Sequence, residues 1–210
     1  MLAKSLLLPV ALLVFALGGP ASGQSPLSDL ELVRTLRAGG TVIVLRHGAT
    51  DADMADTDPL NHDNIAKQRH LSAKGEAAAV ALGDAFRSIG IPVGQVYTSR
   101  FHRAYQTAKL AGFEPIEKTI DLTEGGLVVS PNENARRAQA FRKLASTPPP
   151  AGTNVVIVTH KPNILDAFGK DWFEVKEGEA TIFKPDGSAA KLVARVEMGD
   201  WARIATAAKN

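Results

Sequence analysis

The sequence predicts an α/β fold in three layers, in which a mostly parallel sheet is covered by helices on both faces. Two runs of apolar, largely β-branched residues, 41–45 and 154–159, are typical of strands that are buried on both sides. Helical patterns alternate with these and with further strand-like segments. In such a sheet ligands bind beyond the edge at which the parallel strands end, so functional residues are expected there.

After the first strand, the chain predicts a long helix. Ser72 is a suitable N-cap, and apolar residues recur at helical spacing as far as Ile89. Gly90 ends this helix. A second strand is expected over residues 93–98, followed by a helix over residues 101–110.

The second half of the chain is expected to form a polar helix, a buried strand, a short helix and a closing helix, over residues 131–145, 154–159, 164–168 and 199–208. Residues 179–183 and 191–197 flank a Pro-Asp-Gly turn signal, which predicts a C-terminal hairpin.

The N-terminus has the pattern of a signal peptide. Lys4 precedes a 12-residue apolar run at residues 6–17, and small residues at 21–23 suit a cleavage site. The run is shorter than the roughly 20 residues of a membrane-spanning helix. We therefore expect a signal peptide over residues 1–23, a single domain over residues 24–210, and export to a bacterial periplasm or the medium. An uncleaved anchor is the alternative; after cleavage no stable membrane insertion is expected.

Composition excludes several classes of function. The chain has no cysteine, so neither a disulfide nor thiol chemistry is available. The formal net charge is only +2, which gives no indication of a nucleic-acid or membrane-surface partner. The sequence leaves the oligomeric state open.

Basic side chains follow three of the predicted strands. Arg46 and His47 follow the first, Arg100 and Arg103 follow the second, and His160 follows the late buried strand. Neighbouring strands lie about 4.8 Å apart, so the two histidines converge on one small ligand if their strands are adjacent. Histidines and arginines without a carboxylate in the same motifs indicate an anion site, and an arginine fork matches phosphoryl oxygens. A small phosphorylated substrate is therefore expected.

Two other interpretations of these residues fit the sequence less well. A histidine at a strand end is often only structural, and two histidines with acidic help can bind zinc. The adjacent arginines would repel a dication, and H-E-x-x-H spacing is absent. The acidic segment 51–63 lacks the glycine and terminal glutamate of an EF-hand loop, so we interpret it as a solvated loop beside the site. We expect neither a metal nor an organic cofactor.

Three motifs in this order resemble the histidine phosphatase superfamily, which has the phosphoglycerate mutase-like fold. They are "LRHGAT" after a buried strand, "YTSRFHRAYQTA" in the middle and "VTH" after a late buried strand. The similarity extends over residues 41–163 and includes "QRHLSAKGEAAAVALG" between the first two motifs.

The resemblance implies a role for each basic residue. His47 would be the nucleophile and become a phosphohistidine, while Arg46 and Arg103 would bind the phosphoryl oxygens. His160 would be the second histidine of the phosphate pocket. At the position of Arg100 the family often has another residue, so Arg100 departs from the resemblance, and we expect it to bind substrate from the rim.

The resemblance also implies an acid that protonates the leaving oxygen. Glu124 in "DLTEGG" matches its position, and Glu179 is the alternative. Arg69 could reach the substrate, but we interpret it as a surface arginine. Lys161 follows His160, where the acid phosphatase branch has an aspartate, which favours the smaller branch.

Together these observations predict an exported phosphatase that hydrolyses phosphomonoesters through a phosphohistidine on His47. A neutral imidazole is nucleophilic, and nearby cations lower its pKa. Two alternatives remain: a phosphomutase with the same mechanism, and a protein of this fold that binds an anion without turnover. The natural substrate is not evident from the sequence.

Overall fold

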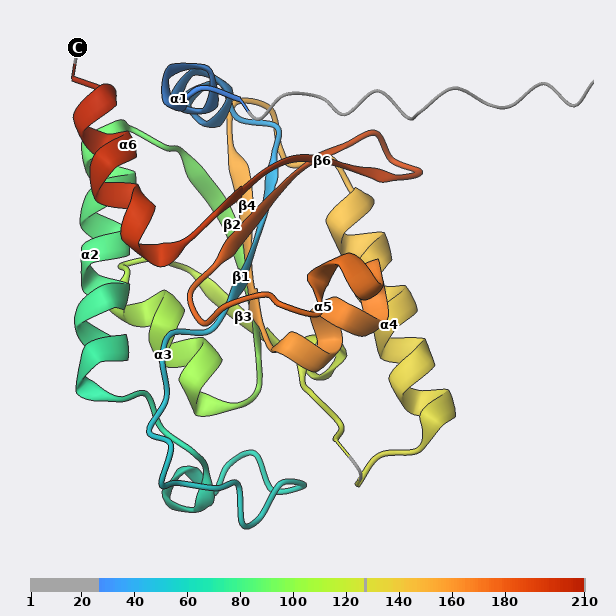
Figure 1. Ribbon diagram of the computed structural model, residues 1–210. Coiled ribbons are helices and arrows are strands. Elements are labelled where there is room, and N and C mark those ends of the chain that lie inside the picture. The colour runs from blue at the N-terminus through green and yellow to red at the C-terminus, as the bar shows by residue number, and fades with distance from the viewer. Residues whose placement is uncertain (1–26, 127, 210) are drawn as a thin grey trace, which may run out of the picture.

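A computed structural model describes residues 27–126 and 128–209. Its six-stranded sheet has the order β3-β2-β4-β1-β5-β6 (Figure 1). The strands are β1 (Val42–Arg46), β2 (Val93–Ser99), β3 (Ile116–Thr119), β4 (Asn154–Thr159), β5 (Ala180–Pro185) and β6 (Ala190–Val196). The first four are parallel to one another, whereas β5 is antiparallel to both β1 and β6. The predicted α/β fold with a mostly parallel sheet and a C-terminal hairpin is therefore confirmed.

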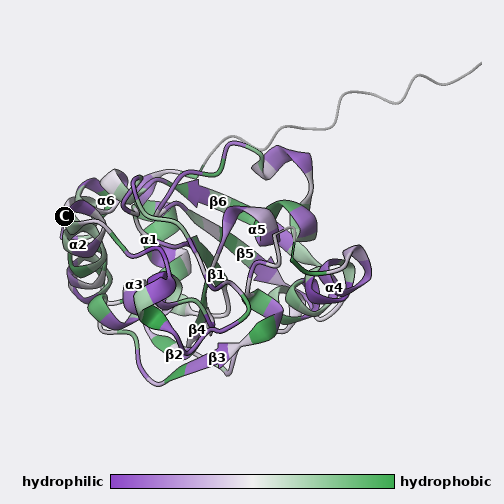
Figure 2. Cartoon of the chain, turned by 90° about the horizontal axis from the view of Figure 1, so that it is seen from below, coloured by the Kyte–Doolittle hydropathy of each residue, from purple (hydrophilic) through white to green (hydrophobic). Residues whose placement is uncertain are grey.

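Helices cover both faces of the sheet. They are α1 (Asp29–Ala38), α2 (Ala73–Ile89), α3 (His102–Leu110), α4 (Pro131–Ser146), α5 (Lys161–Phe168) and α6 (Trp201–Ala207). Helices α1, α2, α3 and α6 lie on one side, and α4 and α5 lie on the other (Figure 2). The view in Figure 2 is from below, onto the edge at which β1, β2 and β4 end.

The central strand β1 has fully buried side chains on both faces, as its apolar run predicts. Ile43 and Leu45 pack into the core beneath α1, α2, α3 and α6. Val42 and Val44 pack into a second core beneath α4 and α5. Successive residues of a strand point to opposite faces, so a strand between two helical layers needs apolar residues throughout.

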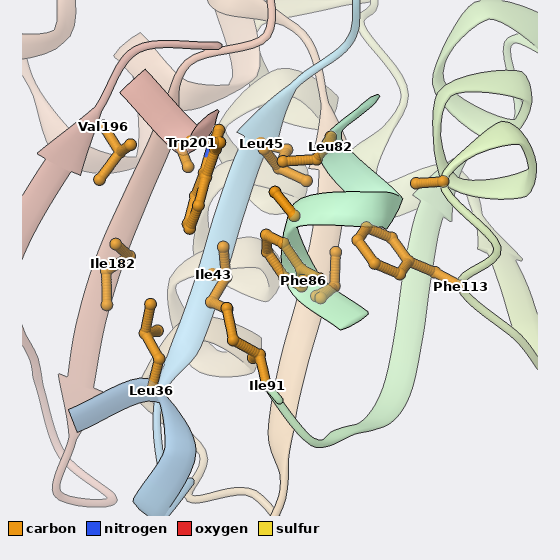
Figure 3. Packing of buried hydrophobic residues seen from close by; sticks show 14 of the residues in the cluster. Leu36, Ile43, Leu45, Leu82, Phe86, Ile91, Phe113, Ile182, Val196 and Trp201 are labelled. Carbon is orange, nitrogen blue, oxygen red and sulfur yellow. The ribbon is translucent and has the colours of Figure 1, made fainter. Parts of the chain in front are cut away.

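Aromatic rings pack against one another in the core beneath α1, α2, α3 and α6. Phe86 of α2 lies between Phe113 and Trp201, with ring centroids 5.0 and 4.8 Å apart (Figure 3). Burial of rings of this size contributes strongly to stability. This core fixes α2 against the sheet and therefore fixes where α2 begins, which is beside the carboxyl end of β1.

Helix α2 has the caps that the sequence predicts. The Ser72 hydroxyl accepts a hydrogen bond from the Gly75 amide at 3.2 Å, and Gly90 ends the helix with a left-handed φ of 77°. Two other predicted boundaries are wrong. Helix α5 begins at Lys161 rather than Ile164, with proline in its first turn, where the missing amide costs nothing. The closing helix begins at Trp201 rather than Gly199, because residues 198–200 form a 3₁₀ turn.

The structure contains two elements beyond those expected from the sequence, α1 and β3. Helix α1 has a capping box, in which Ser28 and Glu31 exchange hydrogen bonds. Strand β3 has only four residues, Ile-Glu-Lys-Thr, at the edge of the sheet, and none is fully buried. A polar edge strand of this length lacks the apolar run that indicates a buried strand.

Within the described ranges, no helix is both long enough and apolar enough to cross a membrane. The predicted signal peptide and its cleavage site lie outside the described residues.

Candidate active site

The pairing of β1 with β4 brings the two predicted site histidines together. Arg46 pairs with Thr159 in parallel register, and each is followed by a histidine. The rings of His47 and His160 are 5.1 Å apart between centroids, with their planes at 60°. Both side chains are almost fully buried, with 2% and 1% of their surface exposed. The expectation that their strands are adjacent is confirmed.

The His47 ring presents one nitrogen for chemistry. Its Nδ1 lies 2.8 Å from the Gly48 carbonyl oxygen. Because a carbonyl oxygen can only accept, Nδ1 carries the hydrogen and donates it to that oxygen. Nε2 then has a free lone pair, which is the form that a nucleophilic imidazole requires.

The turn after His47 is fixed by two helices. The Gly48 amide donates to the Thr107 hydroxyl of α3 at 3.0 Å. At the start of α2, a Cβ atom on Gly75 would lie 2.0 Å from the Ala49 carbonyl oxygen, so only glycine permits this close approach. The nucleophile is therefore positioned by backbone contacts to rigid elements.

Both histidines are neutral at neutral pH. Burial and, after it, the charge on Arg103 lower the pKa of His47 to about 3. Burial also places the pKa of His160 well below its usual range, again with a contribution from Arg103. A neutral His47 keeps its lone pair available over the whole physiological range.

Contacts from three directions hold the His160 ring. Its Nε2 lies 2.7 Å from the Ser99 hydroxyl at the end of β2. The ring edge of Phe101 approaches it with centroids 5.5 Å apart. Its Nδ1 lies 3.6 Å from Glu124 Oε1. Ser99 did not emerge from the sequence as a site residue, although its place in the "YTSR" motif at a strand end was the signal that could have indicated it.

Arg103 is fully buried within the site. Its Nη1 donates to Asp56 Oδ1 at 2.9 Å, and its Nη2 donates to Glu124. The guanidinium carbon lies 4.4 Å above the centre of the Phe101 ring. The predicted residues Arg103 and Glu124 are therefore in direct contact.

Arg46 is the last residue of β1, and its side chain is partly exposed. Its Nη1 donates to the Val175 carbonyl at 2.8 Å, and its Nη2 lies 3.5 Å from Glu177 Oε1. The motifs that carry these arginines contain no carboxylate, but carboxylates from other segments contact both side chains. Folding brings Asp56, Glu124 and Glu177 to them from three separate loops, which no local motif indicates.

Glu124 is positioned by its backbone. The Thr159 hydroxyl donates to the Leu122 carbonyl at 2.6 Å, and Arg137 Nη1 donates to the Thr123 carbonyl at 3.0 Å. These bonds place Glu124 at the end of β4, beside His160. The structure thus brings this predicted acid into the site.

The alternative acid, Glu179, is directed elsewhere. Its carboxylate accepts hydrogen bonds from the Lys176 amide at 3.0 Å and from Arg195 Nε of β6 at 2.5 Å. Its backbone contacts the strand end, because its carbonyl oxygen accepts a hydrogen bond from the Arg46 amide at 3.1 Å. Among the described residues, its carboxylate is therefore a structural group of the hairpin.

Two further arginines lie at the periphery. Arg100 is at the rim, with Nη2 3.4 Å from Asp63 Oδ1 and a side chain that is 43% exposed. The Arg69 amide donates to Asp56 Oδ1 at 2.9 Å. After burial and Arg103, the charge of Arg69 is among the causes that lower the pKa of His47 and His160. Arg69 is therefore closer to the site than its interpretation as a surface residue implied.

Three buried nitrogens of the site have no hydrogen-bond partner within the described part of the chain. They are Arg46 Nε, Arg103 Nε and His160 Nδ1. Leaving a buried donor unpaired costs about 1–3 kcal/mol. Acceptor oxygens of a bound anion would supply the missing partners. Residues 27–126 and 128–209 contain no group of three or more histidine and acidic side chains placed to hold a metal.

Residues 42–128 match the family model of the histidine phosphatase superfamily (branch 1). This segment contains the first two motifs and Glu124, while His160 lies beyond it. No match to the sequence was found among curated proteins.

Solved structures of similar fold were found as well. The protein histidine phosphatase SixA, solved with tungstate, has a TM-score of 0.54 and 18% identity over 76% of this chain and 98% of its own. The product of an open reading frame of Mycobacterium tuberculosis has a TM-score of 0.51 and 17% identity, covering 73% of this chain and 95% of its own. A putative alpha-ribazole-5'-P phosphatase of Escherichia coli K-12 has a TM-score of 0.50 and 18% identity, covering 73% and 94%. At these identities the likeness shows a shared fold.

Proposed function

We propose, from the membership of residues 42–128 in the histidine phosphatase superfamily, that this protein hydrolyses phosphomonoesters through a phosphohistidine on His47. One observation carries the proposal. The free Nε2 of a neutral histidine lies beside a second histidine and two arginines. Three buried nitrogens of these last three side chains have no partner among residues 27–126 and 128–209. A phosphoryl group supplies both an electrophilic phosphorus for the lone pair and oxygens for these donors.

The first half-reaction forms the phosphoenzyme. His47 Nε2 attacks phosphorus, and the bond from phosphorus to the ester oxygen breaks. Arg46, Arg103 and His160 donate hydrogen bonds to the phosphoryl oxygens, which stabilises charge in the transition state. Glu124 in its protonated form gives a proton to the leaving oxygen, so the product departs as an alcohol.

The second half-reaction restores the enzyme. Water attacks phosphorus while Glu124, now a carboxylate, takes one of its protons. The bond between phosphorus and Nε2 breaks, His47 returns to its neutral form, and inorganic phosphate leaves. The chain's own residues account for every proton in both steps.

The proposal is tested by trapping the intermediate. Wild-type protein mixed with labelled phosphomonoester and quenched in detergent should carry label that is lost in acid and stable in base. His47→Ala should carry none and should not release phosphate. His102→Ala, which changes a half-buried histidine outside the site, is the matched control and should retain both. Normal turnover by His47→Ala would overturn the mechanism.

Two alternatives are separated by the same assay. A protein of this fold that only binds an anion would bind vanadate without releasing phosphate from an aryl phosphate, a substrate that needs little acid assistance. A phosphomutase would return the label to a second hydroxyl of its product rather than to water.

A phosphorylated protein is a second class of substrate that one observation favours. Large apolar side chains are exposed on the three loops that carry Asp56, Glu124 and Val175 to the site. They are Met54, Leu60, Ile65, Val128 and Phe173. Apolar side chains around a site can bury surface of a macromolecular substrate. Leu60→Ser with Phe173→Ser should raise KM for a phosphorylated protein and leave KM for nitrophenyl phosphate unchanged; equal effects on both would exclude this class.

We further propose that residues 1–23 direct export and are removed. Mass spectrometry of protein fractionated from its host should give a mature chain that begins near Gln24. A mass that includes Met1 would instead favour an uncleaved anchor.

A further inference from the structure

Ser99 is a buried hydroxyl at the end of β2 that contacts the second histidine of the site. Its Oγ lies 2.7 Å from His160 Nε2 and 3.3 Å from Thr123 Oγ1. It also accepts a hydrogen bond from the Phe101 amide at 3.1 Å. A serine hydroxyl has one proton, so Ser99 can donate to only one of its two other neighbours.

The surroundings of Thr123 decide where that proton lies. The Thr123 hydroxyl donates to the Thr119 carbonyl at 2.9 Å and accepts from the Arg100 amide, also at 2.9 Å. The Thr123 hydroxyl therefore already uses its own proton, so it can only accept a hydrogen bond from Ser99. At 3.3 Å that contact is longer than the roughly 2.5–3.0 Å of an O–H···O hydrogen bond. The 2.7 Å contact to His160 Nε2 is the favourable place for the Ser99 proton.

The surroundings of His160 Nδ1 also indicate that Nε2 accepts a hydrogen bond from Ser99. The ring is neutral, so only one of its nitrogens carries a hydrogen. Nδ1 lies 3.6 Å from a Glu124 carboxylate oxygen. A lone pair on Nδ1 would face this acceptor oxygen, which is bound by Arg103, and, in the proposed reaction, the oxygens of the phosphoryl group. A hydrogen on Nδ1 faces both favourably and leaves Nε2 to accept from Ser99.

We propose that Ser99 is a positioning residue that holds His160 in the Nδ1–H tautomer, so that His160 donates a hydrogen bond to the transferring phosphoryl group. The inference rests on the proposed function of the site. His47 and His160 then share one tautomer but present opposite ends to the substrate. The Gly48 carbonyl fixes His47 so that it offers a lone pair, and the Ser99 hydroxyl fixes His160 so that it offers a proton.

The experiment compares two neighbouring buried hydroxyls. Ser99→Ala removes the donor to His160. Thr98→Val removes a fully buried hydroxyl that has no hydrogen-bond partner within the described residues, so it is a matched control. Ser99→Cys keeps the shape of the side chain and offers only a weak S–H donor. Ser99→Cys is included in case Ser99→Ala fails to fold, because Ser99→Ala also removes the acceptor of the Phe101 amide.

Two readouts are needed on the full chain. The tautomer of His160 is read from nitrogen-15 chemical shifts and long-range couplings in histidine-labelled protein, with the signal assigned by His160→Gln. Wild-type protein should show hydrogen on Nδ1 and none on Nε2. In Ser99→Ala the Nε2–H form should become populated, while Thr98→Val should resemble wild type.

Activity gives the second readout. In Ser99→Ala, kcat for nitrophenyl phosphate should fall by roughly 10- to 100-fold, the range for groups that orient a functional histidine. KM should change little, and Ser99→Cys should lie between Ser99→Ala and wild type. A wild-type His160 with hydrogen on Nε2, or a Ser99→Ala variant with unchanged tautomer and kcat, would overturn the inference. If wild type had no turnover, the proposed function would fail, and the tautomer alone would still decide the role of Ser99.

Discussion

Asp56 Oδ1 and Arg103 Nη1 are 2.9 Å apart, which joins the loop after β1 to the most deeply buried cation of the site. The same carboxylate oxygen accepts from the Arg69 amide, so this contact also fixes the loop. A phosphoryl group bound by Arg103 would lie close to the charge on Asp56. Like charges at short range in a protein repel by several kcal/mol before screening. Asp56 therefore weakens anion binding while it holds the loop in place.

We predict that Asp56→Asn binds inorganic phosphate more tightly, by about tenfold, because it removes the charge but keeps an acceptor oxygen for Arg103 and Arg69. The inhibition constant of phosphate against nitrophenyl phosphate hydrolysis measures this. Asp53→Asn removes the same charge from an exposed position in the same loop and should leave the constant nearly unchanged. Weaker phosphate binding in Asp56→Asn would mean that Asp56 mainly orients Arg103.

A second prediction concerns metals. Turnover should survive dialysis against EDTA. Vanadate, which mimics the five-coordinate transition state of phosphoryl transfer, should inhibit it. The reason is that the charges of Arg46 and Arg103, with a hydrogen bond from His160, stabilise the phosphoryl oxygens as a metal would otherwise do. Metal analysis of the active protein is the control. Activity lost in EDTA and restored by zinc or magnesium would contradict the prediction.

The positions of the two histidines could be predicted from the sequence because they depend on strand ends. The apolar runs before His47 and His160 predict buried strands, and parallel strands end at a common edge. Arg46 and Thr159 then pair, which places the following histidines side by side. The sequence does not indicate that β1 and β4 are neighbours in the sheet, and the convergence of the two histidines depends on this.

The carboxylates around the arginines could not be predicted in this way. Asp56 is one of several aspartates in an acidic loop, and nothing local distinguishes it from Asp53 or Asp58. Its partner Arg103 is 47 residues away, and Glu177 is far from Arg46 in the sequence as well. Such contacts depend on how loops pack over the strand ends, and single-sequence periodicity contains no information about that packing.

The buried histidines should also make stability depend on pH. Burial lowers the pKa of folded His47 to about 3, against about 6.5 in an unfolded chain. Between these values the unfolded state binds more protons, so stability is fully present above pH 6.5 and is lost as the pH falls. The pKa of His160 is lowered as well, because this side chain is also buried.

We predict that the free energy of unfolding of wild type falls by about 1.4 kcal/mol per pH unit for each of these histidines below their unfolded pKa. Urea unfolding between pH 6 and 5, above the range in which most carboxylates titrate, measures the slope. His160→Gln removes one titrating group and should reduce the slope by about one proton. Identical slopes in the two proteins would show that His160 is not held neutral by folding.

The last prediction concerns Glu124, which contacts Arg103 and lies 3.6 Å from His160 Nδ1. If Glu124 protonates the leaving oxygen, its loss matters most when that oxygen is strongly basic. An alkyl alkoxide needs a proton as its bond to phosphorus breaks, whereas a nitrophenolate scarcely does. General acid catalysis contributes roughly 10²- to 10⁴-fold, so Glu124→Gln should slow an alkyl phosphate by about that factor and nitrophenyl phosphate much less.

Glu179→Gln is the matched control for this measurement. The Glu179 carboxylate binds Arg195 and the Lys176 amide, so its change should lower stability without any dependence on the leaving group. A leaving-group dependence in Glu179→Gln and none in Glu124→Gln would transfer the acid role to Glu179. Equal losses for both substrates in Glu124→Gln would mean that Glu124 acts by orienting Arg103. In that case the proton must come from water or from the substrate, and alkyl phosphates would be poor substrates of the wild-type enzyme too.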